Sequence, residues 1–196
     1  MKKVLFLMAA ICSVIVLAED IRLPQPRKKG GITLREALAQ RQTVRNFKDE
    51  ELTTSQLSNV LWCANGVNRN NGKRTAPSAM DRREVMIYVV LKRGAYFFDP
   101  EKHALTKVSD SDLRSLCGRY EAPCYLVLVP DLAKQPREIF AAVDTGYVSQ
   151  NIYLGAISND LGTCAMGSVA DPAKLSEKLK LGKNRPFLVH PVGIPQ

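Results

Sequence analysis

Residues 41–47 read Arg41-Gln42-Thr43-Val44-Arg45-Asn46-Phe47 and join a predicted helix to a predicted extended segment. Upstream, Leu34, Ala37 and Leu38 recur at the spacing of one helix face, and Arg41 falls on the same apolar stripe. We therefore expect the Arg41 guanidinium to point inward, where it needs an anion. The alternative is that it reaches solvent or pairs with Glu36.

The chain after Arg41 is predicted to extend, because Thr43, Val44 and Phe47 are β-branched or aromatic. Alternation along an extended chain turns Thr43 and Arg45 to the same side. Two guanidiniums and one hydroxyl are thus expected to converge on a single phosphate group.

The N-terminus has the layout of a secretory signal. Met1-Lys2-Lys3 precedes an apolar run from Val4 to Ala18, and Val16 and Ala18 occupy the −3 and −1 positions of a cleavage site. The run is shorter than the roughly 20 residues that span a bilayer, so a retained membrane anchor is the less favoured reading. We predict a signal peptide over residues 1–18 and an exported, periplasmic protein.

The net charge of the chain is +9, and loss of the two lysines with the signal would leave +7. The basic residues cluster at Arg27-Lys28-Lys29, from Arg69 to Arg74, and at Arg82-Arg83. Neither interleaved aromatics nor a nucleic-acid motif accompanies these clusters, so we expect a solvated basic face and no nucleic-acid partner.

The four cysteines that follow the predicted signal peptide indicate neither a metal site nor a disulfide framework. With His103 and His190 they form no zinc-type spacing, and none makes a CxxC. Cys117 and Cys124 are a conceivable pair, but apolar surroundings favour buried free thiols. His190, in an apolar strand, is predicted to be a core residue, and His103 to lie on the surface. The four cysteines are Cys63, Cys117, Cys124 and Cys164.

One α+β domain is predicted over residues 33–196, after an extended lead-in over residues 19–32. Thr33 with Glu36 and Thr53 with Gln56 have capping-box spacing at the starts of two helices. Further helices are expected over 110–117, over 136–160 and from Asp171-Pro172 to Gly182. Strands are expected over 85–91, 96–99, 104–108, 125–129 and 187–194.

The helix predicted over 136–160 is apolar almost all round, which indicates a buried helix. It is expected to be either the central core element of the domain or the shared core of a dimer. Gly146, Gly155 and Ala156 would permit close approach of a neighbouring helix.

Four motifs, in order, resemble those of the FMN-dependent nitroreductase family. Residues 41–47 are similar to its Arg-x-Ser/Thr-x-Arg/Lys-x-Phe signature, and Ala76-Pro77-Ser78-Ala79 to its Pro-Ser turn. Gln150-Asn151 with Leu161-Gly162-Thr163 resembles its long helix and following turn, and Val192-Gly193-Ile194-Pro195 its terminal motif. The resemblance implies a mixed, largely antiparallel sheet flanked by helices, with the long helix at a dimer interface.

The resemblance also implies a set of cofactor-binding residues. Arg41, Thr43 and Arg45, with Gln42 between them, would hold the FMN phosphate and ribityl chain. Pro77, Ser78 and Ala79 would run along the isoalloxazine ring, and the N–H groups of Ala165, Met166 and Gly167 would face flavin N5 and O4. Asp81 stands where the family usually has asparagine, and a carboxylate cannot donate as an amide does. No metal is implied, and the chain ends at Gln196, where many members continue into a basic tail.

The implied activity is ping-pong hydride transfer at flavin N5 in a homodimer, with the cofactor carrying the chemistry and no catalytic side chain required. NAD(P)H is a cytosolic pool, so an exported member needs another electron donor or an acceptor for the electrons it removes. The Leu61-Trp62-Cys63-Ala64-Asn65-Gly66 segment resembles the peptide-heterocycle dehydrogenase branch. The alternative is an exported protein of the same fold that binds a flavin or another planar anion without turnover.

Overall fold

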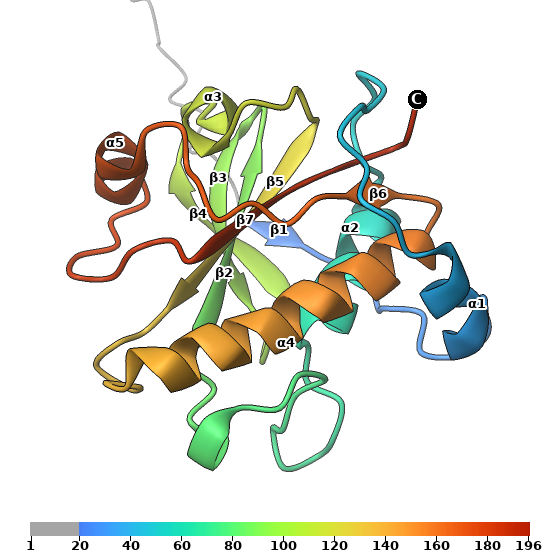
Figure 1. The fold of residues 1–196 in the computed structure, drawn as a ribbon, viewed down its shortest axis with the longest axis horizontal. Coiled ribbons are helices and arrows are strands. Elements are labelled where there is room, and N and C mark those ends of the chain that lie inside the picture. Colours follow the sequence, from blue (N-terminus) through green and yellow to red (C-terminus); the bar gives the residue numbers. More distant parts are fainter. Residues whose placement is uncertain (1–19) are drawn as a thin grey trace, which may run out of the picture.

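A seven-stranded sheet forms the centre of the computed structural model, which describes residues 20–196 (Figure 1). The strand order is β1-β4-β3-β2-β5-β7-β6, and every pairing is antiparallel. The strands are β1 (Ile21–Arg22), β2 (Val85–Leu91), β3 (Gly94–Asp99), β4 (Ala104–Ser109), β5 (Cys124–Pro130), β6 (Gly162–Thr163) and β7 (Leu188–Gly193). The α+β class predicted from sequence is confirmed, and the predicted signal peptide lies outside the described residues.

The helices lie around this sheet, with α1 and α5 at opposite ends of the molecule (Figure 1). They are α1 (Leu34–Gln40), α2 (Thr54–Asn65), α3 (Arg114–Cys117), α4 (Glu138–Ile157) and α5 (Pro172–Lys178), with a short 3-10 turn, η1 (Ala79–Asp81). Both predicted capping boxes are present at Thr33 and Thr53. Among the described residues, none of these helices combines the length and apolar character needed to cross a bilayer.

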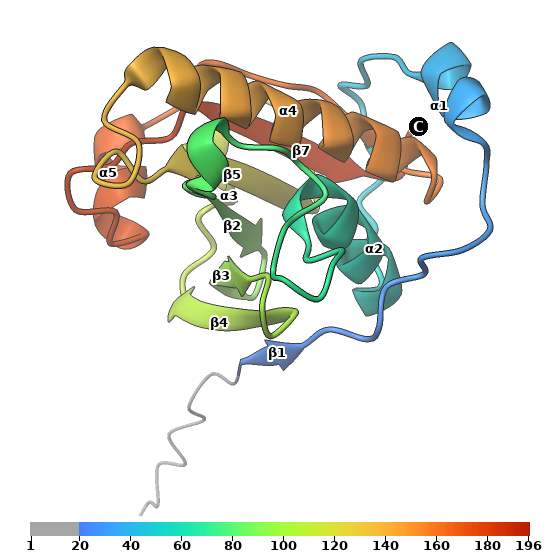
Figure 2. The ribbon, with the colours of Figure 1, turned by 90° about the horizontal axis from the view of Figure 1, so that it is seen from below.

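Alternation along β2 divides the core into two clusters, one on each face of the sheet. Side chains at 85, 87, 89 and 91 pack with α2 and α4, whereas Tyr88 and Val90 pack with residues of α3 and α5. Figure 2 shows β4 and β1 at the sheet edge remote from α4. The sheet therefore separates the α2 and α4 layer from the α3 and α5 layer.

Three helices differ from their predictions, and the last of them ends at Lys178 rather than at Gly182. The short helix begins at Arg114 rather than near 110, because the Asp112 carboxylate accepts from the Arg114 N–H (3.1 Å) and holds the preceding residues in a turn. The long helix is not buried all round, since Ile139, Val143 and Tyr147 are 68%, 43% and 47% exposed. Its opposite side, which includes Ile152, is fully buried.

The predicted free thiols and the core histidine are confirmed. Cys117, Cys124 and Cys164 are buried, Cys63 is half-buried, and all four are free. His190 is fully buried. The surface prediction for His103 is wrong, because its Nε2 lies 2.7 Å from the Ser58 hydroxyl and its ring packs edge-on against Phe98.

Candidate active site

The signature segment, residues 41–47, runs as an extended chain beside β6. The Val44 N–H donates to the Thr163 carbonyl (2.9 Å), and Phe47 pairs with Pro195. Val44 packs toward Gly162, where an added Cβ would lie 2.7 Å from the Val44 Cβ. Val44 thus packs against the turn after α4, while Thr43 faces Tyr153 of α4.

Arg41 does not point into the interior of the chain, which corrects the sequence expectation. It is exposed, as are Leu34 (64%) and Leu38 (53%), and only Ala37 (3%) of the apolar stripe is buried. The physical reason is that α1 packs on α4 through one narrow side, and no element of residues 20–196 covers the remainder. The alternative pairing with Glu36 is also absent, because that carboxylate accepts from the Thr33 N–H (2.6 Å).

The two signature arginines are available to an anion. The Arg41 Cζ lies 5.5 Å from the centroid of the Tyr153 ring, and Arg45 is exposed. Within residues 20–196 neither guanidinium makes an ion pair with a carboxylate. Gln42 is exposed between them.

Tyr153 of α4 brings two of the predicted segments together. Its hydroxyl lies 3.4 Å from the Thr43 Oγ1 and accepts from the Ala165 N–H at 2.8 Å. Sequence reasoning missed this residue, because a tyrosine on an apolar helix reads as core packing. The only available signal was its position two residues after Asn151, within a segment already likened to the family.

The segment from Ala165 to Gly167 leaves the sheet edge beside β7. The Met166 N–H donates to the Val189 carbonyl and the Val189 N–H returns the bond, both at 2.9 Å. A Cβ placed on Gly167 would meet nothing within 4 Å, so there is open space next to this backbone. For the Gly167 N–H we find no protein partner in the described part of the chain.

The Pro-Ser turn is held against the first half of α4. The Asp144 carboxylate accepts from the Ala79 N–H (2.7 Å), and the Ser78 hydroxyl accepts from the Arg83 N–H (2.9 Å). The backbone is left-handed at three non-glycine positions of the turn, Met80, Asp81 and Arg83. Such conformations cost about 1 kcal/mol or more each and are often found at functional sites.

Asp81 is engaged within this turn, because its Oδ2 lies 2.7 Å from an Arg83 nitrogen. Pairing with Arg83 lowers the pKa of Asp81, so the residue is a carboxylate that cannot donate a hydrogen bond.

Within one chain, the Pro-Ser turn does not lie next to Arg41 and Arg45. The turn meets α4 at Asp144, and the arginine segment meets it at Tyr153. Nine residues of helix separate these contacts, a distance of about 13 Å. The predicted site residues therefore form two half-sites along one helix.

A buried carboxyl lies beneath the Pro-Ser turn. Glu84 is fully buried, and neither of its oxygens receives a hydrogen bond from a donor in residues 20–196. Burial, together with the neighbouring Asp144 carboxyl, raises the pKa of Glu84 to about 7. A protonated Glu84 can donate to Asp144, whereas an ionised one would be a buried charge facing another carboxylate.

His190 supports Tyr153 from the core. The Thr163 hydroxyl donates to the Pro191 carbonyl (2.8 Å), so it accepts from His190 Nδ1 (3.1 Å), and Nε2 accepts from the Ser149 hydroxyl (2.9 Å). Burial lowers the pKa of His190 to about 3, so the ring is neutral. Its ring packs edge-on against Tyr153, with centroids 5.6 Å apart.

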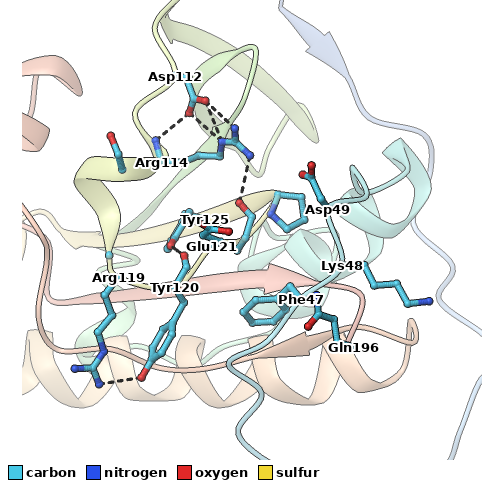
Figure 3. A pocket seen from close by; sticks show the side chains of 14 residues that line it. Phe47, Lys48, Asp49, Asp112, Arg114, Arg119, Tyr120, Glu121, Tyr125 and Gln196 are labelled. Carbon is cyan, nitrogen blue, oxygen red and sulfur yellow. Dashed lines mark hydrogen bonds and ion pairs between the residues drawn. The ribbon is translucent and has the colours of Figure 1, made fainter.

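A cavity of about 630 Å³ opens between the 118–123 loop and the extended segment around Phe47 (Figure 3). Tyr120, Tyr125 and the C-terminal Gln196 also line it, together with charged side chains of both signs. Gly118 on its wall is next to Met166, since a Cβ there would lie 2.5 Å from the Met166 Cε. Apart from Phe47, sequence reasoning did not anticipate these residues.

Comparison with known proteins confirms the resemblance. The family model described as "Nitroreductase family" matches residues 38–194, and the chain belongs to the nitroreductase family. A "putative nitroreductase" of Methanocaldococcus jannaschii is 30% identical over 194 residues, covering 89% of this chain and 96% of the relative.

Solved structures agree with this assignment. A "putative nitroreductase" of Ralstonia eutropha JMP134 superposes with a TM-score of 0.85 at 34% identity, over 90% of each chain. An FMN-dependent nitroreductase of Clostridium difficile R20291 shares the fold at a TM-score of 0.60 and 20% identity, over 83% of this chain and 88% of the other. Family and fold together are those of flavin oxidoreductases.

Proposed function

We propose that the protein is an exported FMN-dependent oxidoreductase that works as a homodimer by ping-pong hydride transfer at flavin N5. The observation that carries the proposal is that Tyr153 joins Arg41 and Thr43 to Ala165, two residues before the Gly167 N–H, for which residues 20–196 offer no partner. We place the phosphate at Arg41, the sugar chain at Thr43 and the flavin ring beside Gly167, where the backbone borders open space.

The residues present fit the cofactor. Arg41 and Arg45 are exposed guanidiniums without carboxylate partners in residues 20–196, suited to bidentate phosphate binding. Open space beside Gly167 suits a planar ring lying close to backbone. When bound, FMN would supply the hydride chemistry, while the chain would bind and orient it, with the Gly167 N–H left to donate to the ring.

The apolar face of α1 and α4 supports the dimer. Leu34, Leu38, Ile139, Val143 and Tyr147 are each at least 43% exposed, on the two helices that carry the half-sites. Ile139, Val143 and Tyr147 recur at four-residue spacing on one side of α4, and an exposed apolar stripe of this kind favours association. In a symmetric dimer, the Pro-Ser turn of one subunit would complete the site that begins at Arg41 of the other.

Export and the nature of the electron donor are proposed from the sequence. They rest on the signal-like N-terminus and on the absence of an NAD(P)H pool outside the cytosol. The dehydrogenase-like reading of residues 61–66 supports a substrate that is oxidised, with electrons passed onward.

The test is the visible spectrum of the full chain, produced in a cell that can export it and purified from the periplasmic fraction. We expect a yellow protein that photoreduces under anaerobic conditions and has the mass of a dimer by light scattering. A colourless protein that takes up no added FMN would refute flavin binding. A yellow protein that cannot be reduced would instead indicate binding without turnover, and rapid NAD(P)H oxidation would contradict the donor argument.

A further inference from the structure

Tyr153 contacts both ends of the half-site from a single position on α4. Its ring lies 5.5 Å from the Arg41 Cζ, and its hydroxyl accepts from the Ala165 N–H at 2.8 Å. The ring therefore contacts the end of the site where we place the phosphate. The hydroxyl contacts the end where we place the flavin ring.

The position of Tyr153 is set by the core and not by a loop. His190, fully buried, packs edge-on against its ring at an interplanar angle of 78°. The hydrogen bonds of His190 to Ser149 and Thr163 use both ring nitrogens, so the histidine is fixed in orientation. Because a fixed side chain supports it, Tyr153 can hold Arg41 at a defined place.

The hydroxyl of Tyr153 occupies one of the three N–H groups that the family resemblance directs toward the flavin. The Met166 N–H is taken by the Val189 carbonyl. The Gly167 N–H is then the remaining donor for which residues 20–196 offer no partner. The hydroxyl oxygens of Tyr153 and Thr43 lie 3.4 Å apart, which is longer than an ordinary O–H···O bond, and either hydroxyl can be the donor.

We infer that Tyr153 is a positioning residue with two separable effects, an inference that rests on the proposed function. The aromatic ring holds the Arg41 guanidinium over the phosphate end and so favours FMN over riboflavin, which has no phosphate. The hydroxyl engages the Ala165 N–H and so limits the backbone donors that can stabilise negative charge on a reduced flavin, which lowers the midpoint potential.

Two substitutions in the full chain separate these effects. Tyr153→Phe keeps the ring and removes the hydroxyl, so we expect an unchanged ratio of FMN to riboflavin dissociation constants. We expect the bound FMN to have a more positive midpoint potential, because the Ala165 N–H is freed to donate. Tyr153→Leu removes the ring as well and should reduce the preference for FMN over riboflavin about fivefold.

The measurements are fluorescence titrations with FMN and with riboflavin, and spectroelectrochemical titration of the FMN-loaded protein. Tyr88→Phe, in the core cluster on the other face of the sheet, is the matched control and should behave as wild type. A Tyr153→Phe potential equal to or more negative than that of wild type would overturn the inference. Equal weakening of FMN and riboflavin binding in Tyr153→Leu would overturn it too. If Tyr153→Leu does not fold, the potential of Tyr153→Phe decides, and a wild type that binds neither flavin refutes the proposed function itself.

Discussion

Replacing Glu84 with glutamine should make the protein more stable at alkaline pH and leave it unchanged at acidic pH. In the unfolded chain the Glu84 pKa is 4.5, and burial together with the Asp144 carboxyl raises it to about 7 in the folded protein. Between these values the folded state holds a proton that the unfolded state has released. Stability therefore falls as pH rises from about 4.5 to about 7, and the loss is complete above that range.

The difference between 4.5 and about 7 corresponds to at most about 3 kcal/mol. Glutamine copies the neutral carboxyl in size and can donate its amide N–H to Asp144, so it should not pay this penalty. The pKa of about 7 already includes the opposing effect of the nearby Arg82 charge. We expect Glu84→Gln to exceed wild type by 1–3 kcal/mol, as an order-of-magnitude estimate, at pH 8 and to equal it at pH 4.5.

The assay is urea unfolding at pH values between 4.5 and 8, at one fixed protein concentration because association changes apparent stability. His190, whose pKa is lowered by burial, destabilises the fold on acidification in both proteins, so the difference between the two curves isolates Glu84. Glu50→Gln, at an exposed position, is the control and should follow wild type. Parallel curves for Glu84→Gln and wild type would show that Glu84 is ionised when buried and would refute the reasoning.

Three further substitutions test the site, the interface and the helix packing. Arg41→Ala should weaken FMN binding at least about tenfold in a titration and leave the thermal midpoint unchanged. The control Arg35→Ala, in the preceding helix α1, should not weaken FMN binding. Full flavin occupancy in Arg41→Ala would make the phosphate assignment wrong. Val143→Glu places a charge on the exposed apolar face of α4 and should give the monomer mass by light scattering; an undiminished dimer mass would remove this face as the interface. Gly155→Ala should lose about 1–3 kcal/mol in urea unfolding, because the new Cβ would lie 2.6 Å from the Cys63 Cβ; wild-type stability would mean that α2 and α4 can separate without cost.

The elements that sequence predicted best are those with a local cause. The strand over 85–91 matches its predicted bounds, because a run of β-branched residues is interrupted at both ends. Thr33 and Thr53 begin helices because each meets its own capping partner three residues on. These signals need no knowledge of what lies across the fold.

The features that sequence missed depend on neighbours distant in the chain. The apolar stripe of α1 predicted burial, but which surface covers Leu34 and Leu38 is decided by association and not by the helix itself. Tyr153 and Glu84 take their significance from contacts with residues on other elements. Spacing along the chain carries no information on such pairs, so neither was singled out.

The buried sulfur atoms make alkylation a measure of unfolding. Burial raises the pKa of Cys117 to about 12 and also raises that of Cys124, while thiol reagents attack the thiolate. In the folded molecule these sulfurs are therefore both inaccessible and protonated, and a labelling reagent modifies them only after an opening event. In an oxidising compartment, incorrect cross-links at Cys117 and Cys124 would consequently arise from the unfolded fraction alone, so conformational stability would decide the redox fate of these two thiols.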